Sequence, residues 1–186
     1  HQILLLILFS PILVLIALVL LLTGEHKVFF IQERIGYKNT IFRVWKFRTM
    51  YANTENLGTG SITVHNDPRV LPVGKVLNSC KMNELPQLIN VLKGDMTLVG
   101  ARPQMKNDFE KYPEEVQQHI YATRPGITGV GSIIFRNEDR WTKNHNGDVH
   151  EFYKQHIAPY KGEVEMWYQQ NISFSTDVKL IFLTAL

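Results

Sequence analysis

The segment Ile3–Leu22, ILLLILFSPILVLIALVLLL, is the most decisive stretch of this 186-residue chain. Eighteen of its twenty residues are strongly apolar, and no Lys, Arg, Asp or Glu precedes Glu25. A helix of this length spans about 30 Å, the thickness of the hydrocarbon core of a bilayer. The sequence therefore predicts a membrane helix here, and the length of the apolar run argues against a cleaved signal peptide.

Ser10-Pro11 interrupts the apolar run about a third of the way along it. Proline lacks the N–H that would bond the carbonyl four residues before it, so a bend is expected, and the serine hydroxyl can bond a freed carbonyl. Two arrangements remain open. One is a kinked helix that spans the bilayer, and the other is a re-entrant helix-break-helix whose two ends emerge on the same face.

The residues that follow the apolar run are strongly basic. Between Glu25 and Tyr51 there are six basic and two acidic residues, a net charge of +4. Positive flanks of membrane segments tend to lie in the cytoplasm, and they are attracted to anionic lipid headgroups. This flank is therefore expected on the cytoplasmic face.

The composition of the whole chain is that of a folded protein. Hydrophobic residues make up 45% and charged residues 20%, which excludes a disordered chain. The net charge of +3 is too small to indicate nucleic-acid binding by itself. The single cysteine, Cys80, excludes an intramolecular disulfide scaffold and is expected to be a small buried residue.

The residues after the basic flank predict a mixed α/β domain that is predominantly helical. Val28–Gln32 and Ile41–Phe47 read as strands, and the turn Gly36–Asn39 between them predicts a β-hairpin. The polar stretch Asn53–Arg69 is expected to be a loop. Helices are expected at Val70–Ser79, Glu84–Leu92, Met105–Lys111, Pro113–Ala122, Val149–Gln170 with an interruption near Pro159-Tyr160, and Asp177–Leu186.

The last of these helices, Asp177–Leu186, is unusually apolar, with seven hydrophobic residues in ten, and it follows Trp167 and Tyr168. Ten residues are too few to span a bilayer. The helix is therefore either part of the core or an in-plane interfacial helix with aromatic side chains at the level of the headgroups. The predicted organisation is a membrane element at residues 1–24 and a cytoplasmic catalytic domain at residues 25–186.

The densest group of chemically capable residues lies between Lys81 and Pro103. Asn83 is expected to be a helix N-cap, with Pro86 in the first turn. Glu84 would then lie at the positive end of a helix dipole, where phosphate groups also bind. A carboxylate and a phosphate at one helix start need a cation between them, which favours Mg²⁺. The alternative is that Asn83 and Glu84 only cap the helix.

This stretch carries a resemblance to a known family. Asn83-Glu84-Leu85-Pro86-Gln87-Leu88, continuing through Gly94-Asp95-Met96 to Arg102-Pro103, resembles the signature of the bacterial sugar transferases. These are the monotopic phosphoglycosyl transferases that start glycoconjugate assembly. Further stretches similar to the family are Gln32–Gly36, Trp45–Met50, Arg124–Gly129, the apolar start with Ser10-Pro11, and the ending from Asn171 to Leu186. The resemblance covers essentially the whole chain, in order.

The resemblance implies a reaction and a location. A sugar 1-phosphate would pass from a UDP-sugar to polyprenyl (undecaprenyl) phosphate with Mg²⁺ as cofactor, releasing UMP, as the first membrane step of glycan assembly. It also implies a re-entrant helix broken at Ser10-Pro11, contact with membrane lipids, and a place on the cytoplasmic face of the bacterial inner membrane. Downstream membrane-associated glycosyltransferases are candidate partners, and no nucleic-acid partner is expected.

The resemblance also implies roles for single residues. The family uses an adjacent Asp-Glu pair that sits with Mg²⁺, and its Asp is the nucleophile that forms a phosphosugar-enzyme intermediate. Here these positions are Asn83 and Glu84, so Glu84 is the expected metal ligand. Lys46 matches a lysine of the family's basic strand, Arg102 the arginine of its Pro-Arg-Pro stretch, and Asp177 an acidic residue near the nucleotide.

Two further arginines are expected to bind phosphate. Phosphoryl transfer requires charge to be neutralised on the transferred oxygens. Arg48 and Arg124 are cationic candidates for this task beside the lysine and the arginine just named. The alternative for each is an ordinary surface charge.

Asn83 is the main departure from the family pattern. An amide carries no charge, and its nitrogen lone pair is delocalised, so it cannot replace a carboxylate as nucleophile. Asn83 is then an engineered change that stops turnover, the mark of a subgroup in which Glu84 is the nucleophile, or the sign of direct transfer to the acceptor phosphate. Asn78 and Ala101 replace the usual Arg and Pro, which favours a natural variant. The alternative function is a catalytically impaired, membrane-anchored binding or scaffold protein.

Overall fold

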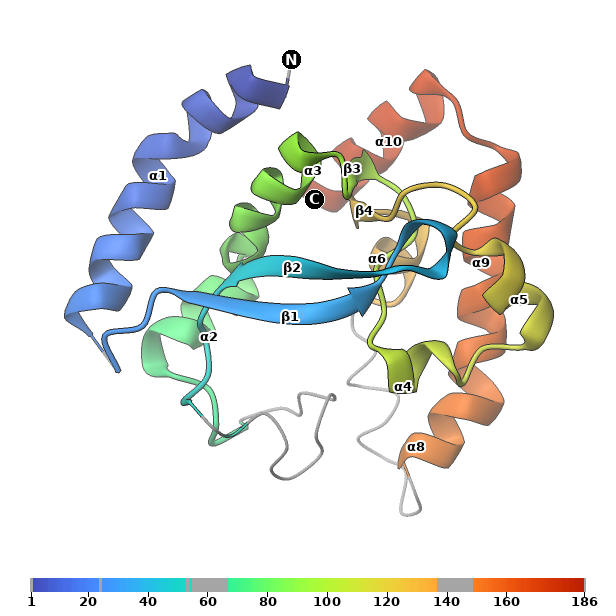
Figure 1. The fold of residues 1–186 in the computed structure, drawn as a ribbon, viewed down its shortest axis with the longest axis horizontal. Coiled ribbons are helices and arrows are strands. Elements are labelled where there is room, and N and C mark those ends of the chain that lie inside the picture. The colour runs from blue at the N-terminus through green and yellow to red at the C-terminus, as the bar shows by residue number, and fades with distance from the viewer. Residues whose placement is uncertain (1, 24, 53, 55–66, 137–148, 186) are drawn as a thin grey trace. The chain divides into compact units, whose positions relative to one another are not determined.

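The computed structural model describes residues 2–23, 25–52, 54, 67–136 and 149–185. Helices dominate this part of the chain, and the strands form two small two-stranded sheets (Figure 1). The mixed, mostly helical fold class predicted from the sequence is confirmed. The chain divides into two compact units. The first comprises His1–Gln32 and Arg43–Gly94, and the second comprises Glu33–Phe42 and Asp95–Leu186.

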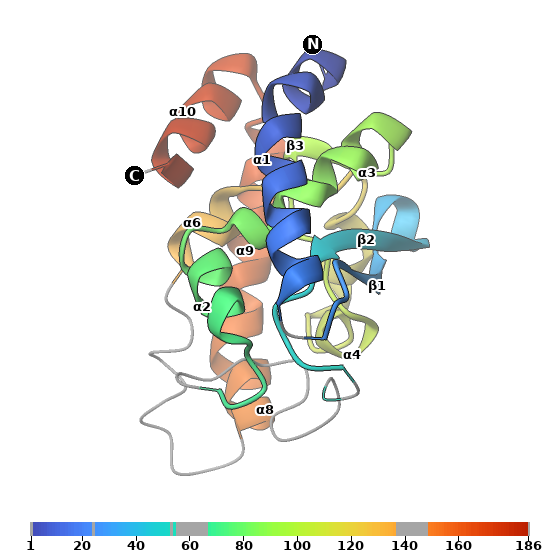
Figure 2. The same cartoon turned by 90° about the vertical axis from the view of Figure 1, so that its left-hand side faces the viewer.

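In the first unit, the apolar segment forms helix α1 (Gln2–Leu22), seen along its length in Figure 2. The hydroxyl of Ser10 donates a hydrogen bond of 2.7 Å to the carbonyl of Ile7. This is the carbonyl that Pro11, having no N–H, leaves without its helical donor. The predicted compensation by serine is thus confirmed, and the helix continues through Pro11. Among the residues whose side chains the structure describes, no helix is both long enough and apolar enough to cross a membrane.

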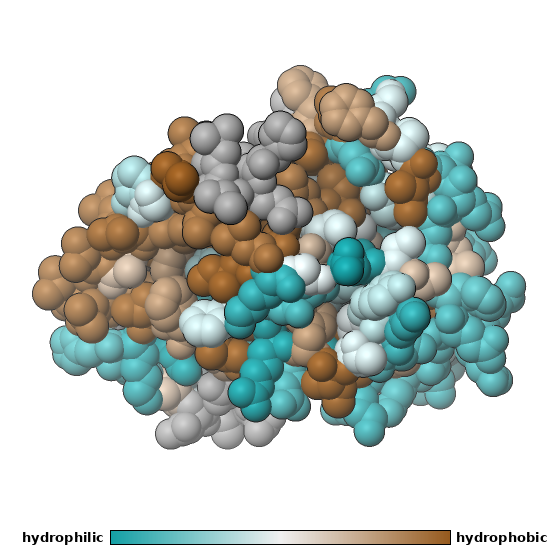
Figure 3. All heavy atoms as spheres, turned by 45° about the horizontal axis from the view of Figure 1, so that its top comes forward, coloured by the Kyte–Doolittle hydropathy of each residue, from teal (hydrophilic) through white to brown (hydrophobic). Residues whose placement is uncertain are grey.

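One side of α1 packs into the first unit. Ile16 and Leu20 are buried with Phe47 and Leu77 in a single cluster. Along the rest of α1, apolar side chains such as Leu8 remain exposed, and they form part of the hydrophobic surface in Figure 3. The helix therefore presents one apolar side to the protein core and another to its surroundings.

The predicted hairpin is confirmed. Strands β1 (Phe29–Ile35) and β2 (Ile41–Phe47) pair, and a 3₁₀ turn, η1 (Tyr37–Asn39), joins them. Strand β1 ends at Ile35, three residues after the predicted end at Gln32, because its pairing with β2 continues past the apolar residues on which the prediction rested. The ring of Phe29 stacks on that of Phe47 and meets that of Trp45 edge to face, cross-strand contacts that stabilise a sheet.

The helical pair after the hairpin differs from its prediction. Helix α2 (Pro72–Ser79) is followed by a 3₁₀ helix, η2 (Met82–Gln87), and by α3 (Leu88–Lys93). The prediction that Asn83 caps an α-helix is wrong. Lys81, with φ of 58°, reverses the chain and precedes the helix start, so Asn83 lies inside η2. Pro86 also lies in η2.

Cys80 is exposed, so the prediction that it is buried is wrong. It follows the last turn of α2 on the side away from the core, and its Sγ donates to the carbonyl of Val76 at 3.0 Å. An exposed thiol at a helix end bears no packing role.

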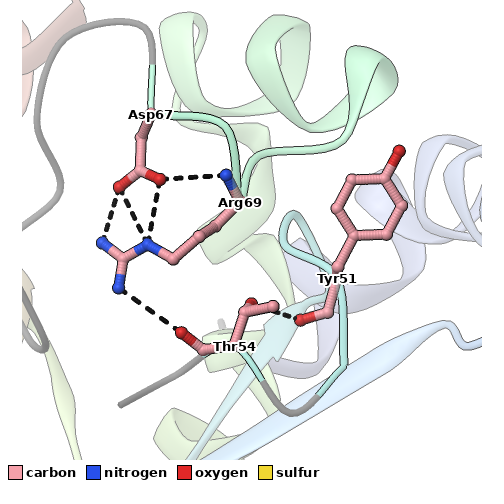
Figure 4. A network of polar contacts seen from close by, with 4 residues as sticks. All are labelled: Tyr51, Thr54, Asp67 and Arg69. Carbon is pink, nitrogen blue, oxygen red and sulfur yellow. Dashed lines mark hydrogen bonds and ion pairs between the residues drawn. The ribbon is translucent and has the colours of Figure 1, made fainter. Parts of the chain in front are cut away.

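An ion pair closes the base of the predicted loop Asn53–Arg69, of which residues 53 and 55–66 lie outside the described residues. The Arg69 guanidinium donates to both carboxylate oxygens of Asp67, at 2.5–3.0 Å, and both side chains are buried (Figure 4). Arg69 also reaches the carbonyl of Thr54 at 3.4 Å. The hydrogen bond and charge of Asp67 raise the pKa of Arg69 above its ordinary value, against the effect of burial. The pair thus joins the two ends of the loop.

Replacing Arg69 with leucine is expected to lower the free energy of unfolding by about 3 kcal/mol, because it removes the positive charge that faces the buried carboxylate of Asp67. The measurement is denaturant unfolding followed by circular dichroism. Lys106→Met is the matched control. It removes an ion pair of 3.9 Å whose side chains are 71% and 57% exposed, and it should change stability by less than about 0.5 kcal/mol. Equal effects of the two changes would contradict the prediction.

The second unit contains a sheet that the sequence did not predict. Strands β3 (Thr97–Val99) and β4 (Gly126–Thr128) pair in parallel, with Thr97 opposite Gly126 and Val99 opposite Thr128. Strands of three residues are too short to produce a periodic pattern. A Cβ added to Gly126 would overlap the backbone nitrogen of Gly100, so no side chain fits between the chains there.

The helices of the second unit are, in sequence order, α4 (Lys106–Phe109), α5 (Glu114–His119), α6 (Val130–Ile134), α8 (Val149–Phe152), the π-helix η3 (Tyr153–Ile157), α9 (Ala158–Gln170) and α10 (Phe174–Ala185). Helix α6 was not predicted. The predicted interruption near Pro159 lies earlier in the chain, at η3. This π-helix has a wider turn than an α-helix, and it precedes the proline, which has no N–H to donate. Helix α10 buries Leu180 but leaves Phe174 86% and Phe182 64% exposed, so it is not an ordinary core helix.

Candidate active site

A largely buried ion pair lies in the first unit. Strand β2 carries Lys46 and η2 carries Glu84, and the lysine Nζ is 3.2 Å from the carboxylate Oε1. The two side chains are only 15% and 11% exposed. Attraction between charges is stronger in such surroundings than in water. The structure therefore brings together two residues that the sequence placed in one site from stretches 38 residues apart.

Asn83, the residue before Glu84 in the chain, has an unsatisfied oxygen. Its Oδ1 is buried and has no hydrogen-bond partner among the described residues. A buried polar atom without a partner costs about 1–3 kcal/mol, and such atoms occur where a ligand, water or ion binds. The atom lies one residue from Glu84, so an amide oxygen and a carboxylate come from adjacent positions of η2. Both are oxygen atoms of the kind that bind hard cations.

The donor set fits Mg²⁺ in kind. Amide and carboxylate oxygens are its usual protein ligands, and Mg²⁺ keeps several waters or takes phosphate oxygens for the rest of its shell. Within the described ranges, no group of three or more His, Cys, Asp or Glu residues could hold a metal ion. A cation held here by Asn83 and Glu84 would therefore take most of its ligands from water and substrate.

Asn90, which the sequence reasoning missed, fixes the strand that carries Lys46. Its side chain is fully buried, donates to the carbonyl of Arg43 at 2.7 Å and accepts from the N–H of Trp45 at 3.0 Å. Both contacts tie β2 to α3 on the residues just before Lys46. The only signal in the sequence was its place in the family-like stretch, because a buried asparagine looks like any helical polar residue.

Arg48 lies two residues after Lys46. Its guanidinium carbon is 5.4 Å from the centre of the Phe30 ring, within the range of a cation–π contact. Arg48 follows Phe47, the last residue of β2, and its backbone N–H donates to the carbonyl of Val28 at 2.9 Å. The expected phosphate-binding role of Arg48 stays a prediction.

The other three predicted site residues belong to the second unit. Arg102 follows β3, and its carbonyl accepts a hydrogen bond of 2.8 Å from the hydroxyl of Tyr121. The guanidinium carbon of Arg124 lies 5.8 Å from the centre of the Tyr37 ring. Asp177 lies in the first turn of α10 and accepts a hydrogen bond of 2.8 Å from the hydroxyl of Tyr168. Their roles toward a substrate stay predictions.

Two buried tyrosines organise these residues. Burial is the main reason that the pKa of Tyr121 lies far above its ordinary value, and burial followed by the hydrogen bond to Asp177 raises the pKa of Tyr168. Both hydroxyls therefore remain protonated and can donate. No pattern in the sequence singles out Tyr121. The interfacial interpretation of the last helix places Tyr168 at the level of the headgroups, but Tyr168 is 2% exposed, so that interpretation is wrong for this residue.

The chain is similar to known sugar transferases. The model of the family described as bacterial sugar transferase matches residues 1–186. The chain is 34% identical, over 95% of its length and 39% of the relative, to the UDP-N-acetylgalactosamine-undecaprenyl-phosphate N-acetylgalactosaminephosphotransferase of Aeromonas hydrophila. It is 36% identical, over 97% of its length and 37% of the relative, to the UDP-glucose:undecaprenyl-phosphate glucose-1-phosphate transferase of Escherichia coli.

A shorter relative is covered more fully. The uncharacterized sugar transferase EpsL of Bacillus subtilis is 36% identical over 91% of this chain and 73% of its own length. The chain thus spans less than two fifths of the Aeromonas and Escherichia relatives and nearly three quarters of the Bacillus one.

Proposed function

Because this chain belongs to the bacterial sugar transferase family, we propose that it transfers a sugar 1-phosphate from a UDP-sugar to polyprenyl phosphate and releases UMP. The names of the Aeromonas and Escherichia relatives support this donor and this acceptor. The structural observation that carries the proposal is the buried ion pair of Lys46 and Glu84, together with the unsatisfied oxygen of Asn83, the residue before Glu84. Such a site can bind a phosphate group and balance part of its negative charge.

In this proposal, residues of the first unit have separate chemical roles. The ammonium of Lys46 neutralises charge on the donor diphosphate as the bond between its two phosphates breaks. Glu84 and Asn83 would hold Mg²⁺, which when bound adds positive charge at the phosphate oxygens. UMP leaves with the oxygen that bridged the two phosphates. Donor binding by Arg102 and Asp177 follows from the resemblance alone, and donor binding by Arg124 from its charge.

Two routes lead to the same products. In a covalent route, a carboxylate oxygen of Glu84 attacks the sugar-bearing phosphorus, UMP leaves, and the acceptor phosphate then displaces Glu84. In a direct route, an oxygen of the acceptor phosphate attacks the same phosphorus. Incubation with a UDP-sugar labelled at the β-phosphorus, without acceptor, separates them, because only the covalent route leaves label on the protein.

The test of the function is UMP release from a panel of UDP-sugars with undecaprenyl phosphate and Mg²⁺, using the wild type and Asn83→Asp. Release by the wild type above that of a boiled sample is the expected result. No release by either protein with any donor would refute the proposal. The second candidate function is a binding or scaffold protein without turnover, because Asn83 stands where the family has its nucleophile. Release by Asn83→Asp alone would identify the wild type as a binding protein.

We also propose that α1 is re-entrant and that α10 lies in the plane of the cytoplasmic leaflet of the inner membrane. The exposed apolar side chains of both helices support contact with lipid. The basic flank after α1 supports the cytoplasmic side.

Labelling of single cysteines tests the re-entrant arrangement. Cys80 is exposed and must first be replaced by serine. In that background, Gln2→Cys and Lys27→Cys are both expected to react with a membrane-impermeant maleimide only after the inner membrane is opened. Gln170→Cys serves as the cytoplasmic control. Reaction of Gln2→Cys from the periplasm in intact cells would establish a spanning helix instead.

A further inference from the structure

We propose that the tip of the β1–β2 hairpin, residues 36–40, and the buried tyrosine to which it is bound hold two arginines in place for the donor substrate. Tyr37 at the tip is the positioning residue for Arg124. Tyr121, the buried tyrosine, is the positioning residue for Arg102. The inference rests on the proposed function, since the arginines bind a donor only if the protein uses a UDP-sugar. The tip, the tyrosines and the arginines all lie in the second unit.

The backbone of the hairpin tip needs support from outside. Lys38 and Asn39 adopt left-handed conformations in succession, with φ of 52° and 57°. This region costs most side chains about 1–2 kcal/mol per residue, and hairpin turns that need it twice usually contain glycine. Such conformations persist where the surrounding structure holds them.

Two hydrogen bonds to the body of the second unit supply this support. The backbone N–H of Lys38 donates to the carbonyl of Tyr121 at 2.9 Å. The side-chain amide of Asn39 donates to the carbonyl of Gln117 at 2.9 Å. The tip is therefore bound in a fixed position instead of projecting freely, and Tyr121 is one of its two attachment points.

Tyr121 is also bound to the backbone on both sides of Pro103. It is 1% exposed, and its hydroxyl donates to the carbonyl of Arg102 at 2.8 Å while accepting from the N–H of Gln104 at 2.9 Å. A hydroxyl can donate and accept at the same time. The carbonyl of Gln104 in turn accepts from the N–H of Ile35, in the hairpin, at 2.8 Å. Tyr121 thus fixes the backbone from which the Arg102 side chain starts.

Tyr37 supports Arg124 through its ring. The ring is in a side chain that is 39% exposed, and its centre lies 5.8 Å from the guanidinium carbon of Arg124 and 5.3 Å from the Nζ of Lys38. Attraction between a cation and a ring restricts a long side chain without neutralising its charge. Two positive charges beside one ring repel each other, and the negative charge of a bound diphosphate would balance both.

These contacts have a consequence for binding. A side chain that is already restricted loses less conformational freedom when it binds a phosphate. Loss of either tyrosine contact should therefore weaken donor binding more than it slows the chemical step.

The test of Tyr37 compares Tyr37→Leu, which removes the ring, with Tyr37→Phe, which keeps it. We expect the KM for the UDP-sugar to rise about fivefold in Tyr37→Leu, with kcat within about twofold of the wild type, as the loss of one exposed cation–ring contact predicts. Tyr37→Phe should retain the wild-type KM, and so should Tyr51→Leu, the control at another exposed tyrosine. In an Arg124→Met background, Tyr37→Leu should raise the KM no further, because the side chain that it positions is gone.

The test of Tyr121 uses Tyr121→Phe, which removes only the hydroxyl. Tyr112→Phe is the control, at another buried tyrosine of the same unit. We expect Tyr121→Phe to raise the KM about tenfold with kcat within about threefold, because two buried backbone groups lose their partner. In an Arg102→Met background the same change should raise the KM no further.

Two measurements do not need turnover. The amide of Gln104 should exchange with solvent at least about tenfold faster in Tyr121→Phe than in Tyr112→Phe, because it loses its acceptor. The NMR signal of the Arg124 Nε–H group should shift more in Tyr37→Leu than in Tyr37→Phe, because only leucine removes the ring. If the wild type releases no UMP, the proposed function fails, whereas these two measurements still decide the positioning.

The inference is open to refutation at each residue. Unchanged KM values in Tyr37→Leu and Tyr121→Phe would overturn it, and so would KM increases that persist after the arginines are removed. Unchanged exchange of Gln104 and an unchanged Arg124 signal would do the same. If circular dichroism shows that Tyr121→Phe does not fold, Tyr121 is a structural residue, and its part of the inference is overturned.

Discussion

UMP release is expected to fall at least about 100-fold when Glu84 is replaced by glutamine. Glutamine keeps the shape of the side chain but loses the charge that pairs with Lys46 at 3.2 Å. It can neither attack phosphorus nor hold a divalent cation as a carboxylate does, and loss of one group that acts in the transition state costs about 10²–10³ in rate. The measurement is the initial rate of UMP release at saturating donor and acceptor.

Stability must be separated from chemistry in this experiment. Glu84→Gln leaves the ammonium of Lys46 buried without its counterion, which is destabilising in itself. The double variant Lys46→Met, Glu84→Gln removes both charges and should recover part of the lost stability in a thermal unfolding assay, while remaining inactive. An active Glu84→Gln protein, within tenfold of the wild type, would exclude Glu84 from the chemistry.

The stability of the protein should fall with rising pH because of one residue, Glu165. Burial raises the pKa of Glu165 from 4.5 to about 7, despite the opposing charge of Lys161 and the backbone amides of Arg102 and Gly131. Between these two values the folded state holds a proton that the unfolded state has lost, so the contribution of Glu165 declines as pH rises from 4.5 to 7. The difference corresponds to about 3 kcal/mol.

The contribution is isolated by comparison with Glu165→Gln, which cannot titrate. We expect the unfolding free energy of the wild type, minus that of Glu165→Gln, to decrease by about 3 kcal/mol between pH 5 and pH 8. Denaturant titrations at intervals of half a pH unit measure it. Glu163→Gln should follow the wild type throughout. A difference that stays constant across this range would show that Glu165 titrates normally.

Local features of this protein were predictable from its sequence. The hairpin followed from two apolar strands around a turn, and the end of β2 was predicted to the residue. Lys46 and Glu84 were placed in one site by resemblance, and the structure puts them in contact. The compensation of Pro11 by Ser10 followed from the geometry of a helix, because both partners lie within one turn.

Features that depend on distant parts of the chain were not predictable. Strands β3 and β4 consist of three residues each and are specified by the close approach of Gly100 and Gly126, which leaves no pattern in either stretch. Asn90 and Glu165 are buried polar residues in helices, where a sequence alone suggests solvent. The partners of Asn90 lie 45 and 47 residues before it, and Glu165 packs against Gly131, 34 residues before it, so only the folded structure identifies them.

The misassigned helix start at Asn83 has a local cause. Asparagine followed by Glu and Pro has the composition of an N-cap and first turn, but Lys81 adopts a left-handed conformation that usually favours glycine or asparagine. The chain therefore reverses two residues earlier than composition suggests. The result moves Asn83 from the end of a helix into its interior, where its side-chain oxygen is left without a partner.

The hairpin has a consequence for how this protein can be divided. The boundary between the compact units falls within β1 and again within β2, so residues 33–42 belong to one unit although their neighbours on both sides belong to the other. No single cut of the polypeptide separates the two units from each other. A terminal deletion long enough to remove one unit completely therefore also removes part of the other, and a split after Gly94 leaves residues 33–42 of the second unit on the fragment that holds the first.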